Sequence, residues 1–231
     1  MDNWLTRSAS RAGRVVTPAL QAAAAATFGA LALARRARAL HPKGASFHAT
    51  FRPLGVSPTG LELFDAGAEH PALVRFSRGI GLGERLPDLL GLAVKVLEVG
   101  ELHGEQDLLL TTAGTAPVAR HVFRPTRRFA SGMFSSVLPF DVAGRARVLG
   151  AVVEQEPRPG TRVVLRLAQP EGPWGDVAEV VLGTPLDTVQ DGRLRFNVTQ
   201  AAGGIRPLGL LNRLRGPAYE ASQAIEPAPG G

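Results

Sequence analysis

The chain has 231 residues, of which 45% are hydrophobic and 20% charged, so it can form one globular domain with a sizeable core. It contains no cysteine, which excludes a thiolate nucleophile, a disulfide framework and a cysteine-based metal site. The net charge of +6 comes almost entirely from arginines spread along the chain, and aromatic residues make up only 6%. Because few aromatic rings are present to stack bases, we expect no nucleic-acid partner.

The segment of residues 15–34 carries no charge and is dominated by alanine. Three interpretations stay open: an amphipathic helix packed on the body of the protein, a membrane span, and a signal peptide that ends near Ala32-Leu33-Ala34. Pro18 interrupts the run, and alanine contributes little to membrane insertion. The packed helix is therefore the favoured interpretation, for a cytoplasmic protein with weak membrane association through this helix left open.

The rest of the chain is predicted to consist mainly of strands. Seven segments show apolar runs or alternation, with glycine and proline between them: residues 47–52, 72–77, 89–99, 107–112, 162–169, 177–183 and 193–200. Residues 117–130, 142–155 and 208–225 are predicted to be helical, the first broken or kinked at Pro125. Many short strands with late helices suggest an α+β fold, an antiparallel β-barrel with helices packed outside and an N-terminal helix. Periodicity alone does not separate a barrel from an open sheet.

We expect three parts along the chain. Residues 1–36 would form an N-terminal helical extension, and residues 37–226 the barrel domain. Residues 227–231 are rich in proline and glycine and are expected to be a disordered tail.

Three stretches carry motifs that point to a known family. The first is residues 38–44, RALHPKG; the second combines residues 74–77, VRFS, with residues 91–95, GLAVK; the third is residues 215–219, RGPAY. In this order, over residues 38–222, the chain resembles the haem catalase superfamily, and within it the short catalase-related, mini-catalase-like proteins. The resemblance implies a barrel of the catalase type and haem b, with its iron, as the cofactor.

The resemblance also implies roles for particular residues. Tyr219 would be the proximal ligand of the haem iron, since a phenolate can occupy that position. Arg215 lies four residues before it, so a helix would place both on one face, and its charge would favour the phenolate. Arg38 and Arg75 would bind the haem propionates.

On the distal side, His41 would be the acid–base group that moves a proton between the two oxygens of a peroxide. Ser77 would hydrogen-bond His41 and fix its tautomer. Catalases have a distal asparagine in the segment that corresponds to residues 107–112, and this chain has Thr111 and Thr112 instead. Threonine donates a single hydrogen bond and does not mimic an amide.

These departures favour a peroxidase that acts on organic or hydrogen peroxide and has weak catalase activity. Two other hypotheses remain: a haem-free barrel that binds an apolar ligand, and a membrane-associated protein anchored by its first helix. The expected partner is a peroxide or a small organic substrate, and homo-oligomer formation is left open.

Overall fold

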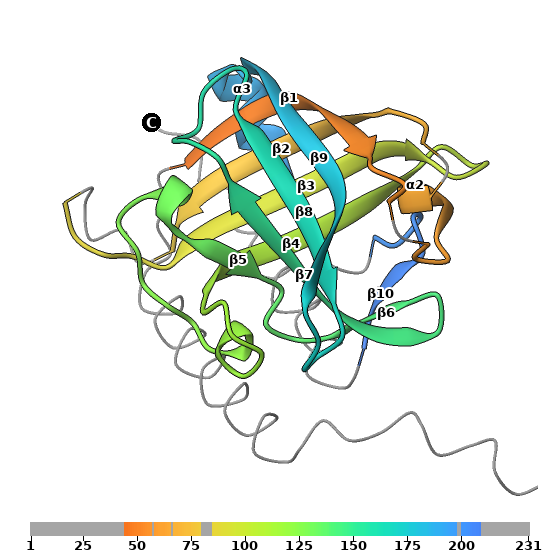
Figure 1. Ribbon diagram of the computed structural model, residues 1–231. Coiled ribbons are helices and arrows are strands. Elements are labelled where there is room, and N and C mark those ends of the chain that lie inside the picture. The colour runs from red at the N-terminus through yellow and green to blue at the C-terminus, as the bar shows by residue number, and fades with distance from the viewer. Residues whose placement is uncertain (1–43, 57, 66, 80–84, 198–199, 209–231) are drawn as a thin grey trace, which may run out of the picture.

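The computed structural model describes residues 44–208, except for residues 57, 66, 80–84 and 198–199. Ten strands make up the sheet of this part of the chain (Figure 1). They are β1 (Gly44–Pro53), β2 (His70–Arg78), β3 (Leu90–Val99), β4 (Gly104–Ala113), β5 (Met133–Ser135), β6 (Phe140–Val142), β7 (Arg145–Val153), β8 (Arg162–Ala168), β9 (Trp174–Pro185) and β10 (Ile205–Pro207).

Eight of the strands close into an antiparallel barrel, in the order β7-β5-β4-β3-β2-β1-β9-β8, with β8 pairing back to β7. The closure joins distant parts of the chain, because Arg52 of β1 pairs with Glu179 of β9. The short strands β6 and β10 extend the sheet beside β7. A closed antiparallel barrel leaves no unpaired edge among these eight strands.

Side chains fill the inside of the barrel. Alternate residues of a strand point to opposite faces of a sheet, and here the inward set is almost entirely apolar. Its members include Phe47, Phe51, Val74, Phe76, Leu92, Val94, Leu108, Leu110, Phe134, Leu165 and Val180, each no more than 5% exposed. Because this interior is occupied by the core, a ligand of the described part of the protein has to bind outside the barrel.

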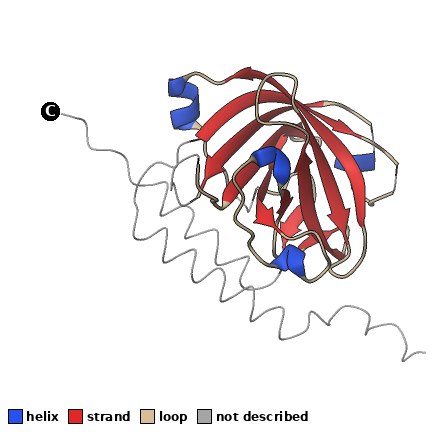
Figure 2. Cartoon of the chain, turned by 60° about the vertical axis from the view of Figure 1, so that its left-hand side comes forward, coloured by secondary structure: helices blue, strands red, loops and turns tan. Residues whose placement is uncertain are grey.

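Helical segments of the described chain are short and lie around the barrel rather than within it (Figure 2). They are α2 (Glu62–Asp65), α3 (Thr188–Arg193) and the 3₁₀ turns η2 (Ala119–His121) and η3 (Phe129–Ser131). A capping box starts α3: Asp187 accepts from the backbone N–H of Gln190, and the Gln190 side chain accepts from the backbone of Asp187. None of the described helices is long and apolar enough to cross a lipid bilayer.

The antiparallel barrel is confirmed, and six of the seven predicted strands lie within or across β1, β2, β3, β4, β8 and β9. Three predictions of secondary structure are wrong. Residues 142–155, predicted to be a helix, form β7; most of residues 117–130 form turns and loop around η2 and η3. Of residues 193–200, predicted to be a strand, Arg193 is the last residue of α3, and residues 194–197 and 200 belong to no strand. The helix predicted for residues 15–34, all but the first residue of the helix predicted for residues 208–225, and the tail lie outside the described residues.

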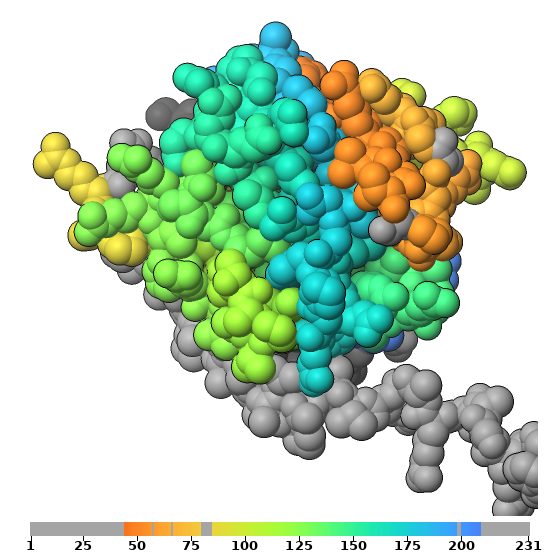
Figure 3. All heavy atoms as spheres, in the orientation of Figure 1, coloured from red at the N-terminus to blue at the C-terminus, as the bar shows by residue number. Residues whose placement is uncertain are grey.

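The outer face of β8 and β9 carries charged side chains, and part of this region faces the viewer in Figure 3. Arg162 of β8 contacts Glu154 and Glu179, at 3.3 and 2.9 Å, and Arg166 contacts Asp176 at 2.7 Å. The Arg162 side chain is 48% exposed. Solvated ion pairs of this kind are typical of an ordinary protein surface.

Candidate functional site

Residues from several of the segments that carried the sequence resemblance meet on the outer face of the barrel, across β1 to β5. The strand register pairs them directly in one line, which we call the outer row: Gly44, Ser77, Gly91, Thr111 and Ser135. Their strand neighbours Phe76, Leu92, Leu110 and Phe134 point into the core, so the row itself faces outward. The outer row therefore places small and hydroxyl-bearing residues side by side over five strands.

Two glycines of the outer row, Gly44 and Gly91, stand where the structure has no room for a side chain. A Cβ atom on Gly91 would lie 2.5 Å from the Ser77 hydroxyl oxygen, and one on Gly44 would lie 2.6 Å from the carbonyl oxygen of Phe76. Both distances are shorter than non-bonded carbon–oxygen contacts allow. Glycine at position 91 thus gives the Ser77 hydroxyl its place on the sheet surface. No hydrogen bond of this hydroxyl occurs within the part of the chain that the structure describes, so it is available to a partner.

Thr111 and Thr112 occupy different environments. Thr111 is half-buried in the outer row, and its hydroxyl donates to the carbonyl oxygen of Leu90 at 3.3 Å. Thr112 points inward and is fully buried, and its hydroxyl oxygen accepts from the backbone N–H of Leu90 at 3.1 Å. Only Thr111 therefore shares a surface with Ser77, while Thr112 replaces a ladder hydrogen bond between β3 and β4.

Arg75 lies on the same outer face, two residues before Ser77 of the outer row. It pairs across the strands with Ser46 of β1 and Ala93 of β3. Its guanidinium group forms an ion pair with Asp191 of α3 and donates to the Ser46 hydroxyl at 3.2 Å; Ser46 in turn donates to Asp191. Burial acts to raise the pKa of Asp191, but the hydrogen bonds from Ser46 and Arg75 and the arginine charge outweigh it, so the pKa lies below its ordinary value. The charge of Arg75 is thus already balanced by a carboxylate.

A second ion pair lies on the same face of the sheet, at Lys95 of β3, two residues after Ala93. The Lys95 ammonium group is 2.9 Å from Asp107 and 2.5 Å from Glu105, and the backbone N–H of Asn197 donates to Asp107 at 2.5 Å. The side chains of Lys95 and Asp107 are 7% and 0% exposed. Burial raises the pKa of Asp107, against the lowering effect of Asn197 and Lys95. This buried ion pair is a structural link between β3, β4 and the segment after α3.

The remaining residues predicted for the site lie outside the described part of the chain. These are Arg38, His41, Arg215 and Tyr219. The structure therefore brings together Ser77 and Thr111, with Arg75 beside them. It does not describe Arg215 and Tyr219, the residues predicted for the proximal side. Among the described residues there is no cluster of three or more histidine, aspartate or glutamate side chains that could hold a metal ion.

Sequence reasoning missed two features of this face. Asp191, the partner of Arg75, stands far along the chain and belongs to no motif, so no local signal identifies it. The helix that carries it does have a signal, the Asp187-x-x-Gln190 capping box. Ser135 is the second feature: it belongs to a strand of only three residues, Met133–Ser135, which is too short to show a period.

Comparisons with protein-family models and with curated proteins found no match for this chain. The class defined by the structure itself is a closed eight-stranded antiparallel barrel with a small-residue, hydroxyl-bearing outer face.

Proposed function

We propose that the chain is a haem-binding, catalase-related peroxidase that acts on organic or hydrogen peroxide and has weak catalase activity. The observation that carries the proposal is the meeting of Ser77, Gly91 and Thr111 in the outer row. The motifs of the resemblance contain Ser77 and Gly91, and Thr111 stands near the place of the distal asparagine. Residues chosen from separate segments of the sequence thus lie on adjacent positions of three strands.

The described residues fit haem b on this face. The glycines of the outer row leave room for a flat group, and the half-buried Ala93, two residues after Gly91, offers apolar contact. Arg75 lies beside them with the charge that a propionate requires. Tyr219 would hold the iron, with Arg215 favouring its phenolate, and Arg38 would hold the other propionate. When bound, haem supplies the redox chemistry of peroxide cleavage.

The chain's own residues would bind and orient the peroxide and move its proton. His41 would take the proton from one peroxide oxygen and return it to the other, while the free hydroxyl of Ser77 would hold the imidazole in the required tautomer. The Thr111 hydroxyl donates its only proton to the carbonyl oxygen of Leu90. It therefore offers a peroxide an acceptor, where a distal asparagine would offer an amide donor. This difference is the reason for expecting weak catalase activity.

One observation favours the second candidate, a haem-free barrel that binds an apolar ligand. Arg75 already pairs with Asp191, and a propionate would have to displace that carboxylate. The two candidates therefore differ in what the Arg75–Asp191 pair does when haem is offered.

The test is a haem titration of the full-length protein, followed by absorption spectroscopy. The parent should bind haem with the spectrum of phenolate-ligated iron, and Tyr219→Phe should change that spectrum. Asp191→Asn releases Arg75 and should bind haem more tightly than the parent, while Arg75→Gln should bind it about tenfold more weakly because a charged hydrogen bond is lost. His41→Ala should retain haem and react with peroxide about 10²–10⁴-fold more slowly.

The haem-free candidate predicts other results. No stoichiometric haem binding by the parent, or a spectrum unchanged in Tyr219→Phe, would remove the haem assignment. Urea unfolding of each variant separates loss of the site from loss of the fold.

A further inference from the structure

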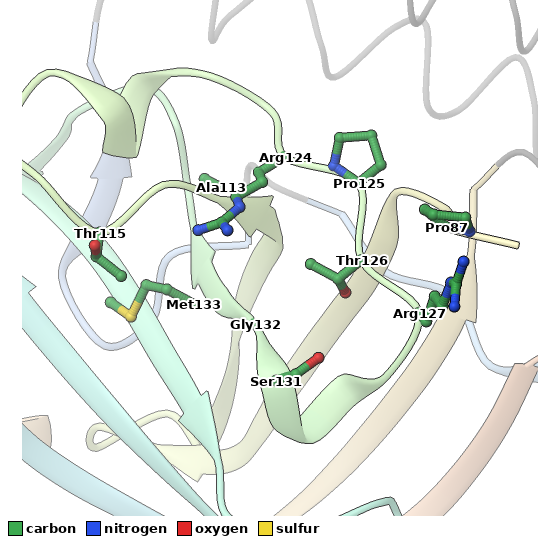
Figure 4. A pocket seen from close by; sticks show the side chains of 10 residues that line it. All are labelled: Pro87, Ala113, Thr115, Arg124, Pro125, Thr126, Arg127, Ser131, Gly132 and Met133. Atoms are coloured by element: carbon green, nitrogen blue, oxygen red, sulfur yellow. The ribbon is translucent and has the colours of Figure 1, made fainter.

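A pocket of about 400 Å³ opens on the outer face beside the outer row (Figure 4). Its floor includes Ala113 of β4 and Met133 of β5, which pair with each other two residues beyond Thr111 and two residues before Ser135. The loop between η2 and η3 forms the opposite wall. The full lining is Pro87, Ala113, Thr115, Arg124, Pro125, Thr126, Arg127, Ser131, Gly132 and Met133.

The loop that forms this wall is fixed to the barrel. The backbone N–H and carbonyl of Thr126 bond to those of Asp88, at 2.9 and 2.8 Å, and the N–H of Arg124 bonds to the carbonyl of Thr112 at 2.9 Å. The Arg78 side chain also donates to the carbonyl of Arg127 at 3.0 Å. The pocket is therefore formed by the fold before any ligand arrives, as is usual for small-molecule sites.

Two positive charges line the pocket without a counter-charge. Arg124 and Arg127 stand on either side of Thr126, and Arg124 extends towards Thr115 and Met133 in Figure 4. Neither guanidinium forms an ion pair with a described residue, whereas Arg75, Arg162 and Arg166 each contact a carboxylate. No carboxylate is among the residues that line the pocket.

Two of the three hydroxyl side chains that line the pocket are already used as donors. The hydroxyls of Thr126 and Ser131 both donate to the carbonyl of Arg128, at 3.2 and 3.0 Å. The oxygen atoms of Thr126 and Ser131 remain acceptors, so the charged hydrogen bonds to an anion must come from the two arginines. The apolar lining, which includes Met133, Ala113 and Pro125, suits the body of an organic molecule.

We propose that this pocket binds a small amphipathic carboxylate, with the carboxylate at Arg124 and Arg127 and the apolar part against Met133 and Ala113. Arginine pairs with carboxylates through two parallel hydrogen bonds, which suits this anion. The volume is near the lower end for ligand sites, which limits the ligand to a short chain or a single ring. The site uses none of the residues assigned to haem, so it does not depend on the proposed function.

Octanoate is the probe, titrated calorimetrically into the full-length protein without added haem, with 1-octanol as its uncharged counterpart. The parent should bind octanoate saturably, and 1-octanol at least about tenfold more weakly, because only octanoate can pair with the arginines. Arg124→Gln and Arg127→Gln should each weaken octanoate binding about tenfold. Arg145→Gln is the matched control: Arg145 is exposed on β7, away from the pocket lining, and its replacement removes the same charge.

Three results would overturn the proposal: no saturable binding of octanoate, equal affinity for 1-octanol, or equal weakening by Arg145→Gln. A failed haem titration alongside normal octanoate binding would remove only the proposed function. Retained haem binding without octanoate binding would remove only this site.

Discussion

The outer face of the barrel has two halves of opposite character. On β7 to β9, Arg162 and Arg166 form solvated ion pairs with neighbouring carboxylates. On β1 to β5, the same side of the sheet carries the outer row, with the Lys95–Asp107 pair excluded from water. Gly150 of β7 marks the boundary, because it pairs with Ser135 on one side and with Arg166 on the other. One barrel thus has one solvated side and one side built for close contact.

The two halves differ in how their charged side chains are stabilised: by water on β8 and β9, and by protein partners at Lys95 and Asp107. A charge on the β7–β9 side keeps its hydration, so its ion pairs contribute little to the free energy of unfolding. The charges of Lys95 and Asp107 on the β1–β5 side have lost water, and each depends on its partner. Substitutions of the same kind should therefore have very different costs on the two sides.

Lys95→Met should have the largest effect. The substitution leaves Asp107 buried without its cation, and removing one partner of a buried pair costs about 3 kcal/mol or more. Urea unfolding measures the loss. The double substitution Lys95→Met with Asp107→Leu should recover most of it, since an apolar pair needs no counter-charge. Equal stability of Lys95→Met and the parent would show that this side is as solvated as the other.

Asp191→Asn should have an intermediate effect of about 1–2 kcal/mol at neutral pH, because the half-buried Arg75 loses a charged hydrogen bond. The pKa of Asp191 is lowered in the folded protein, so its stabilising effect is complete above the unfolded pKa of about 3.9 and is lost as the pH falls through the lower, folded value. The difference between Asp191→Asn and the parent should therefore disappear in strong acid. Unfolding in urea from pH 7 downwards follows it, and a difference that persists unchanged at the lowest pH would contradict the assignment.

Arg162→Gln should have the smallest effect, below about 0.5 kcal/mol. Arg162 contacts two carboxylates, Glu154 and Glu179, but its side chain is 48% exposed. The same urea measurement at low and high salt should show that this small cost decreases further at high salt, because salt screens solvent-exposed ion pairs. A cost similar to that of Lys95→Met would mean that the two halves do not differ.

The sequence allowed much of the barrel to be predicted, because β2, β3 and β9 carry apolar alternation or long apolar runs. It failed at β7, where residues 148–153 carry no polar side chain on either face, so the alternation disappears. Residues with good helical propensity then favoured the wrong interpretation. The helical propensity of these residues was overridden by the pairing of β7 with its neighbouring strands in the barrel.

For the candidate site, motifs identified Arg75, Ser77 and Thr111, but not how they meet. Their adjacency depends on the register of β2, β3 and β4, which no local pattern fixes. The pairing of Arg75 with Asp191 likewise depends on where α3 packs, and this follows from the closed barrel as a whole.

The pairing of Arg52 with Glu179 also sets the order of events during protein synthesis. Strands β1 to β4 are consecutive neighbours and can pair as soon as they leave the ribosome, but β9 must be made before β1 gains its second partner. At about 5–20 residues per second, the intervening chain takes on the order of 10 s to appear. For that time the edge of β1 that will pair with β9 is unpaired and open to pairing with another nascent chain. The yield of folded protein in a cell should therefore depend on what shields β1 until β9 arrives.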